Sequence, residues 1–128
     1  MERTRSDPFA ELFDALATRM SGDRWQPAVD VFETDQAIVL RVELAGVSTA
    51  DLHVSVDGDL VRISGVRRAP TGYTVKRLHQ VEIAFGPFER TLRIGMPFQR
   101  DGVEARLEEG FLCVTLPKLA RRQIDIER

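Results

Sequence analysis

The sequence predicts an all-β fold, an antiparallel β-sandwich, with a short helical arm before it and an extended tail after it. Three observations support this prediction. From Trp25 onward apolar and polar residues alternate with a period of two, Gly and Pro residues separate the alternating runs, and the segment before Trp25 has a helical period. Several short strands with turn residues at such spacing are typical of sandwiches. We therefore expect an arm over 1–24, a domain over 25–118 and a tail over 119–128.

The composition is that of one globular domain with short extensions, because 43% of the 128 residues are hydrophobic and 30% are charged. A formal net charge of -2 with dispersed Lys and Arg gives no basic field for nucleic acid. The single cysteine, Cys113, excludes a disulfide within the chain, and no apolar run is typical of a secretion signal or a membrane span. We expect a cytoplasmic protein that binds neither nucleic acid nor membrane.

The arm places apolar residues on one face of a predicted helix, at positions i, i+3, i+4, i+7 and i+11. Asp7 and Pro8 suit a helix start, and Gly22 suits a stop. A helix of this length is marginal alone in water, so it needs a surface to cover it. It either packs on its own domain or forms a mobile arm for partners and unfolded clients. The candidate client-binding residues are Phe9, Leu12, Phe13, Leu16 and Met20.

Alternation predicts strands over 38–44, 52–57, 61–64, 91–94, 103–108 and 111–116. Asp57-Gly58 predicts a tight hairpin turn between two of them, and Glu109-Gly110 predicts another. The strand over 111–116 is apolar on both faces, so we expect it to be central in its sheet or covered on both sides. Cys113 within it is expected to be a small buried hydrophobe.

Catalytic motifs are absent from the sequence: it has no phosphate-binding glycine loop, no zinc-protease helix, no nucleophile elbow and no paired cysteines. His53 and His79 fall on the polar side of predicted strands, which favours solvated surface residues over metal ligands or catalytic bases. We expect no cofactor, no metal and no enzyme activity. Apolar surfaces remain as the candidate functional features.

The tail ends in Ile124-Asp125-Ile126, whose two isoleucines point the same way from an extended backbone. Burying both side chains gains roughly 3 to 6 kcal/mol, whereas free association costs on the order of 4 kcal/mol or more. A tether raises the effective concentration of such a plug, which makes its docking useful and reversible. A frayed end, or a last strand on the chain's own sandwich, remains an alternative for Ile124 and Ile126.

Five motifs in order resemble those of the small heat-shock proteins, which are built on the α-crystallin domain. They cover 25–126 and are W-x-P-x-x-D-[IV]-x-E-[TD] at 25–34, v-x-L-P-G-v at 42–47, G-x-F-x-R at 86–90, A-x(4)-G-x-L-x-[IV]-x-[LV]-P-K at 105–118, and I-x-I/V at 124–126. The resemblance implies an immunoglobulin-like sandwich of seven or eight strands. It also implies an ATP-independent holdase that binds unfolding clients and passes them to ATP-driven chaperones.

The resemblance further implies two sites between subunits. A strand within 72–84 is expected to be exchanged in a homodimer, with Tyr73, Val75, Leu78, Val81, Ile83 and Phe85 as candidate residues. A groove between 52–56 and 103–107 is expected to accept the tail plug, with Leu52, Val54, Val56, Val103, Ala105 and Leu107 as candidate lining. Alternation alone does not distinguish a groove lining from ordinary core.

The chain departs from the family pattern at a few positions. Ala45 replaces the usual Pro, and Val66 and Ile83 stand where Glu and Arg are common, so the usual ion pairs of the dimer are not expected. The arm and tail are short, which favours a dimer or a small oligomer over a large shell. An alternative function is a CS-type co-chaperone or adaptor, which shares the sandwich but needs neither the plug nor the exchanged strand.

Overall fold

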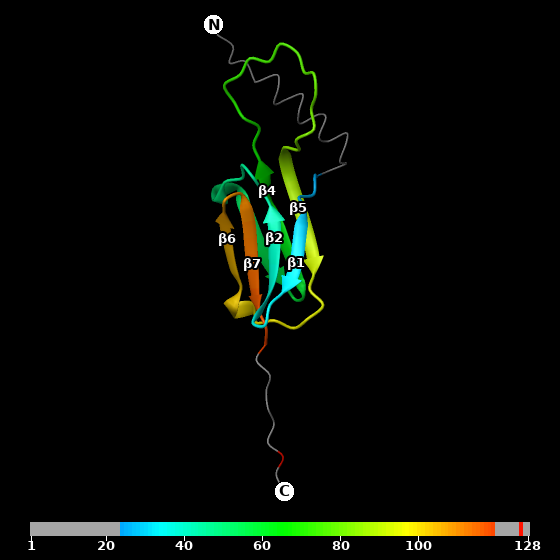
Figure 1. Ribbon diagram of the computed structural model, residues 1–128, viewed down its shortest axis with the longest axis vertical. Helices are drawn as coiled ribbons and strands as arrows, with labels where there is room; N and C mark the ends of the chain where they lie inside the picture. Colours follow the sequence, from blue (N-terminus) through cyan, green and yellow to red (C-terminus); the bar gives the residue numbers. More distant parts are fainter. Residues whose placement is uncertain (1–23, 120–125, 127–128) are drawn as a thin grey trace.

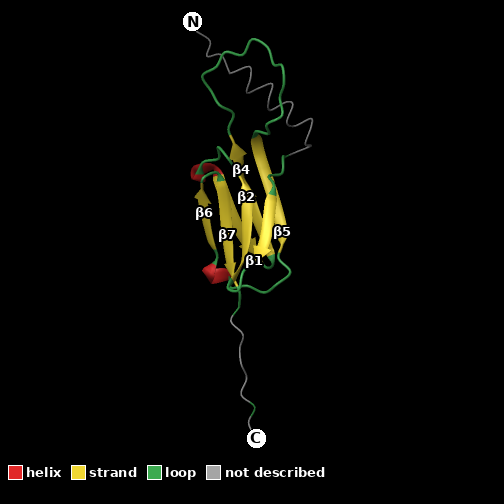
Figure 2. Cartoon of the chain, viewed as in Figure 1, coloured by secondary structure: helices red, strands yellow, loops and turns green. Residues whose placement is uncertain are grey.

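The computed structural model describes residues 24–119 and 126, and within them the fold is a sandwich of two antiparallel sheets (Figure 1). One sheet has the order β1-β2-β7-β6 and the other has the order β3-β4-β5. The strands are β1 (Val29–Glu33), β2 (Ala37–Glu43), β3 (Leu52–Asp57), β4 (Leu60–Arg67), β5 (Gly86–Arg93), β6 (Glu104–Glu108) and β7 (Phe111–Pro117). Two short 3-10 helices, η1 (Thr49–Asp51) and η2 (Arg100–Gly102), cap connections at the sheet ends (Figure 2). The predicted all-β sandwich is confirmed.

The core lies between the sheets and is built by the alternation seen in the sequence. Residues directly opposite each other in an antiparallel pair share a face, so Leu40 of β2 and Val114 of β7 both point inward. Both side chains are fully buried. The other inward side chains of the core include Ile38, Val42, Val61, Ile63, Phe88, Leu112 and Leu116. Burial of this apolar surface is the main force that holds the two sheets together.

Both predicted turns are present. Gly58 has a φ of 62° in the β3–β4 hairpin, and Glu109 and Gly110 have φ values of 52° and 82° between β6 and β7. At Gly110 a Cβ would lie 3.2 Å from the Cα of Ala45, and the Gly110 carbonyl accepts a 2.7 Å hydrogen bond from the Leu44 amide. This turn therefore needs Gly for its backbone angle and for the close approach of the chain after β2.

Strand β5 begins earlier than the sequence predicted, at Gly86 rather than near Thr91. Pro87 was interpreted as a break between strands, but it pairs with Val66 inside the ladder. The strand tolerates this Pro because β5 is an edge strand, where a missing N–H on the free side breaks no ladder bond.

The expectation that β7 is central is confirmed, since it lies between β2 and β6. Its inward side chains are buried, but its outward face is not covered within one chain. Phe111 is 43% exposed, and Cys113 is half-buried. The expectation of a buried Cys113 was wrong because its side chain points to the outer face of the sheet, not into the core.

Residues 68–85 form a long loop that extends beyond the end of the sheets, between β4 and β5 (Figure 1). No strand is assigned to this part of the described chain. His79 lies in this loop and is exposed, in line with the expectation of a solvated surface residue. The exchanged strand over 72–84 stays a prediction, because a single chain offers it no partner sheet.

Candidate functional site: the open edges of the sandwich

The sandwich has two edges, each formed by the last strand of both sheets. A parallel bridge between Trp25 and Phe88 places the start of the β1 segment beside β5. Since β1 and β5 end their sheets on that side, β3 and β6 end them on the other side. The two edges are therefore called the β1/β5 edge and the β3/β6 edge.

The β3/β6 edge carries the residues that the sequence predicted as a groove lining. Val54 pairs with buried Ile63, and Leu107 pairs with buried Leu112, so both side chains face the interior. Leu52, Val54, Val56, Val103 and Leu107 are partly buried and pack against the core, whereas Ala105 is exposed. The structure thus brings the predicted residues to one edge, where they are apolar and still partly open to water. Their role as a docking groove stays a prediction.

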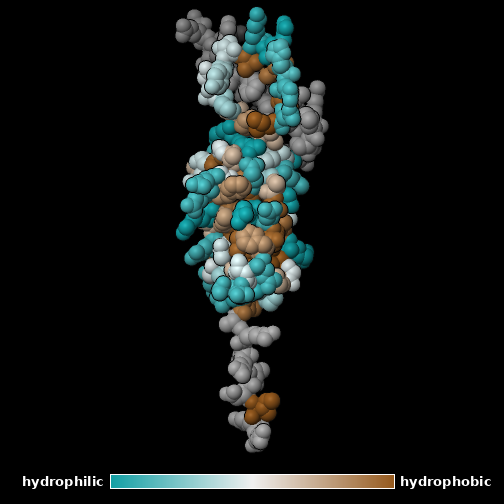
Figure 3. Space-filling view, viewed as in Figure 1, coloured by the Kyte–Doolittle hydropathy of each residue, from teal (hydrophilic) through white to brown (hydrophobic). Residues whose placement is uncertain are grey.

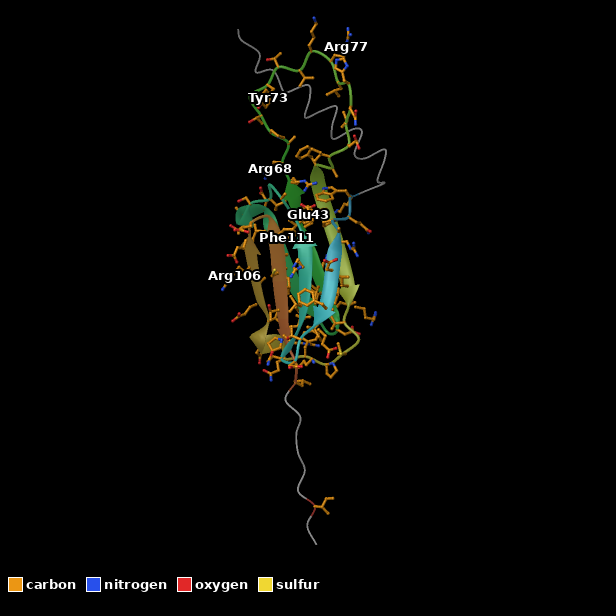
Figure 4. The ribbon with its side chains drawn as sticks, viewed as in Figure 1. Glu43, Arg68, Tyr73, Arg77, Arg106 and Phe111 are labelled. Atoms are coloured by element: carbon orange, nitrogen blue, oxygen red, sulfur yellow. The ribbon has the colours of Figure 1, made fainter. Side chains whose placement is uncertain are left out.

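The outward face of β6 has the opposite character. Glu104, Arg106 and Glu108 alternate with the interior-facing residues and are exposed. Figure 4 shows Arg106 directed away from the sandwich on the side of β6. A shallow cleft of about 710 Å³ lies over this part of the sheet, and its lining includes Cys113 and Thr115 of β7. A segment that docks beside β6 therefore meets apolar side chains inside and a charged row outside.

At the β1/β5 edge, β1 pairs with β2 on one side only. Its other side carries unpaired backbone groups, which form a template for a further strand. Val31 and Phe32 are 49% and 37% exposed, and the guanidinium of Arg41 lies 5.0 Å from the Phe32 ring centroid. On the outer face of this sheet, apolar and charged side chains lie next to each other (Figure 3).

Arg67 closes the upper end of the β1/β5 edge. Its Nε donates a 2.8 Å hydrogen bond to the Ala84 carbonyl, and its Nη1 donates a 3.3 Å bond to the Ala45 carbonyl. The guanidinium lies 4.3 Å from the Trp25 ring centroid, and the Trp25 indole donates a 3.0 Å bond to the Gly86 carbonyl. Burial lowers the pKa of Arg67, and the Glu43 carboxylate opposes this effect.

These contacts hold both ends of the loop over 68–85 against the segment before β1, so the loop ends are fixed on the sandwich. The sequence analysis did not single out Arg67, although the signal was present. Alternation through Val61, Ile63 and Gly65 places residue 67 on the inward face, where an Arg needs partners.

The neighbouring residue Arg68 points outward and makes a bidentate ion pair with Asp51, at 2.9 Å for both contacts. This pair lowers the pKa of Asp51 and raises that of Arg68.

The candidate dimer residues lie in the loop with different exposures. Tyr73 and Ile83 are 76% and 63% exposed, and Tyr73 lies well beyond the sheets (Figure 4). Val75, Leu78, Val81 and Phe85 are partly buried.

In the predicted tail plug, the Ile126 side chain is 90% exposed. Ile124 and the arm residues Phe9, Leu12, Phe13, Leu16 and Met20 lie outside the described residues.

Within residues 24–119 and 126, no group of His, Cys, Asp and Glu side chains is placed to hold a metal ion. The same residues contain no helix with the length and apolar character needed to cross a membrane. The candidate functional features of the described chain are therefore its edges, its loop and Ile126.

Comparison with known proteins identifies the family. The model of the Hsp20/alpha crystallin family matches residues 30–128. The chain belongs to this family. Its members are small heat-shock proteins, which are ATP-independent chaperones and not enzymes. Spore protein SP21 of Stigmatella aurantiaca is 31% identical over 131 residues, covering 91% of this chain and 78% of that protein. The 16.9 kDa class I heat shock protein 1 of Triticum aestivum is 32% identical over 135 residues, covering 94% and 89%.

Solved structures of small heat-shock proteins match the sandwich. Heat shock protein 16.0 from Schizosaccharomyces pombe superposes with a TM-score of 0.68 at 33% identity, covering 81% of this chain and 100% of that chain. A small heat-shock protein from Xylella fastidiosa, described as having a distinct high order structure, gives a TM-score of 0.67 at 27% identity, covering 82% and 99%. The family resemblance drawn from the sequence motifs is confirmed.

Proposed function

We propose that the protein is an ATP-independent holdase of the cytoplasm that binds unfolding proteins through apolar surfaces and keeps them from aggregating. The observation that carries this proposal is the apolar surface that one chain leaves uncovered. Val31, Phe32, Tyr73, Ile83, Phe111 and Ile126 are all exposed, while the core residues between the sheets are buried. Exposed apolar side chains on β1, the loop, β7 and the tail support contacts with other chains, because their burial against a partner is favourable.

The building block of this holdase is a homodimer formed by strand exchange. The free side of β1 offers unpaired backbone groups, and the loop from the other subunit supplies the strand over 72–84. Exposed Lys76 and Arg77 in that loop complement exposed Asp30 on β1. Because each subunit gives one strand and receives one, the contact is twofold and closes on itself.

Dimers associate further through the tail. Ile124 and Ile126 of one subunit dock at the β3/β6 edge of another, against Leu52, Val54, Val56, Val103, Ala105 and Leu107. The partly open apolar side chains of this edge support the proposal, as does the exposure of Ile126. Two isoleucines bind weakly enough that warming releases them, which frees apolar surface for clients. The arm residues Phe9, Leu12, Phe13, Leu16 and Met20 provide the main client contact, and ATP-driven chaperones take the clients over.

The test is a heat-aggregation assay on a model client without nucleotide. Full-length protein is compared with a variant lacking residues 1–22 and with a variant lacking residues 122–128. We expect suppression of light scattering by the full-length protein, clear loss without the arm, and altered assembly without the tail. Aggregation that continues in a molar excess of the full-length protein would contradict the holdase proposal. Unchanged assembly and unchanged protection without the tail would favour an adaptor that binds a folded partner.

A further inference from the structure

We propose that Arg106 on β6 sets the register of the docked tail by pairing with Asp125 from the tail of a neighbouring subunit. The inference rests on the proposed docking of the tail at the β3/β6 edge, and it assigns a role to charged residues that the apolar plug alone does not explain.

Arg106 is the centre of a symmetric charged row, Glu104-Arg106-Glu108, on the outward face of β6. On one side its cross-strand neighbour is Cys113 of β7, and on the other side lies the free edge of the sheet. The ion pairs of the described residues involve five other cations and do not include Arg106. The side chain points away from the sandwich (Figure 4). An exposed cation between two carboxylates is therefore available to a strand that adds beside β6.

An extended tail beside β6 has only a few possible registers. With Ile124 and Ile126 turned toward the interior, Asp125 lies on the outward face with the charged row. A slip of one residue turns both isoleucines to solvent. A slip of two residues places Asp125 opposite Glu104 or Glu108, where like charges repel. Only the register with Asp125 opposite Arg106 combines buried isoleucines with opposite charges. Glu104-Arg106-Glu108 and Ile124-Asp125-Ile126 are each symmetric about the central residue. The same register is therefore favoured whether the tail runs parallel or antiparallel to β6.

We assign the docked tail to a neighbouring subunit, since the chain's own backbone is held in place where β7 ends. The Lys118 amide donates to the Gln36 carbonyl at 2.9 Å, and the Gln99 amide donates to the Pro117 carbonyl at 2.8 Å. These bonds hold both sides of the chain where β7 ends. A return to a site beside Glu104 spans about 14 Å, while the five residues from Lys118 to Gln123 reach about 17 Å fully extended. That segment would also have to reverse its direction while almost fully extended, so docking on a neighbouring subunit is the less constrained arrangement.

The experiment measures binding of a fluorescent peptide, with the sequence of residues 119–128, to the full chain in which Ile124→Ala and Ile126→Ala disable the resident tail. Fluorescence anisotropy gives the Kd. We expect Arg106→Glu in the receiving chain to raise the Kd of the wild-type peptide about fivefold. Asp125→Arg in the peptide should raise the Kd by about the same factor when the receiving chain keeps Arg106. Combining both changes should restore most of the affinity.

Arg41→Glu in the receiver is the matched control. Arg41 lies in the same cross-strand row, beside Cys113 on the β2 side, about 10 Å from Arg106 and out of reach of the tail. We expect its replacement to leave the Kd unchanged. The Asp125→Arg peptide cannot disturb the fold of the receiver, so this arm of the test holds even if a receiver variant is unstable.

The outcomes separate the inference from the proposed function. No binding of the wild-type peptide, or equal binding of a peptide with both isoleucines replaced by Ala, overturns tail docking and the register inference with it. The register inference alone is overturned if binding needs the isoleucines but its Kd does not change with the charge at positions 106 and 125. It is also overturned if the combined charge swap does not restore the affinity. Tail docking stands in both cases.

Discussion

The two edges of the sandwich differ in how they are closed. At the β1/β5 edge, backbone bonds link Trp25 with Pro87 and with Glu89, each at 3.4 Å, and Arg90 donates to the Pro27 carbonyl at 3.0 Å. At the β3/β6 edge, no backbone hydrogen bond joins the two strands within the described residues. The difference indicates two kinds of partner. In the proposed assembly, the first edge accepts a strand that pairs with the free backbone of β1, and the second accepts apolar side chains between the sheets.

The largest expected effect comes from removing the apolar side chains that the β3/β6 edge accepts. Replacing Ile124 and Ile126 together with Ala should remove about 3 to 5 kcal/mol from tail docking, since most of the buried apolar area is lost. Light scattering should then find a dimer instead of a larger assembly, because β1 still receives its strand. Gln123→Ala is the control and should keep the wild-type mass. An unchanged mass in the double variant would contradict the assignment of this edge to the tail.

Arg67→Ala should open the β1/β5 edge at its upper end. It leaves the Ala45 and Ala84 carbonyls without their donor and removes the contact with Trp25. The expected loss in the free energy of unfolding is about 2 to 4 kcal/mol, measured by urea denaturation.

The neighbouring Arg68→Ala is the matched control for Arg67→Ala. Its ion pair with Asp51 is exposed and screened by solvent, so the expected loss is much smaller than that of Arg67→Ala. Equal losses for the two variants would show that Arg67 does not hold the edge.

Ile83→Lys should weaken the dimer without harming the subunit. The side chain is 63% exposed in the single chain, so its cost arises when a partner covers it. We expect a loss of about 1 to 2 kcal/mol in dimerisation, seen by sedimentation equilibrium. Gln80→Lys, an exposed change in the same loop, is the control. An unchanged dimerisation constant in Ile83→Lys would show that Ile83 is not part of the contact with β1.

The smallest expected effect is a pH dependence of the ion pair between Asp51, just before β3, and Arg68, just after β4. The pKa of Asp51 is lowered below its ordinary value of 3.8, chiefly by the hydrogen bonds from Arg68. Its contribution is therefore fully present at neutral pH and is lost as the pH falls through the lowered pKa. The difference in urea midpoint between wild type and Arg68→Ala should shrink only in strong acid. A difference that already vanishes near pH 5 would contradict this.

Much of the fold could be predicted from the sequence because burial on one face imposes a period of two. The runs around Leu40, Val54 and Val114 became strands, and Gly58 and Gly110 mark real turns. The start of β5 was missed because Pro87 is disfavoured in a central strand, and only the sheet order reveals that β5 is an edge.

The functional features were predicted less completely, for physical reasons. Alternation gives the interior-facing side chains, such as Leu52 and Leu107, but not which strands end their sheets, because pairing is set by contacts distant in sequence. The polar neighbours Arg67 and Arg68 look equivalent in sequence, yet one is buried and the other exposed. The proposed strand over 72–84 needs a partner sheet from a second chain, so one chain alone does not test it.

The central claim is that β1 takes a backbone partner while the β3/β6 edge takes the tail. Hydrogen exchange of the full-length protein, compared with Ile83→Lys and with the double change of Ile124 and Ile126 to Ala, tests it most directly. We predict that β1 amides lose protection only in Ile83→Lys, and β6 amides only in the double variant. Equal exchange of β1 in all three proteins, or loss at both edges in either variant, would contradict the account.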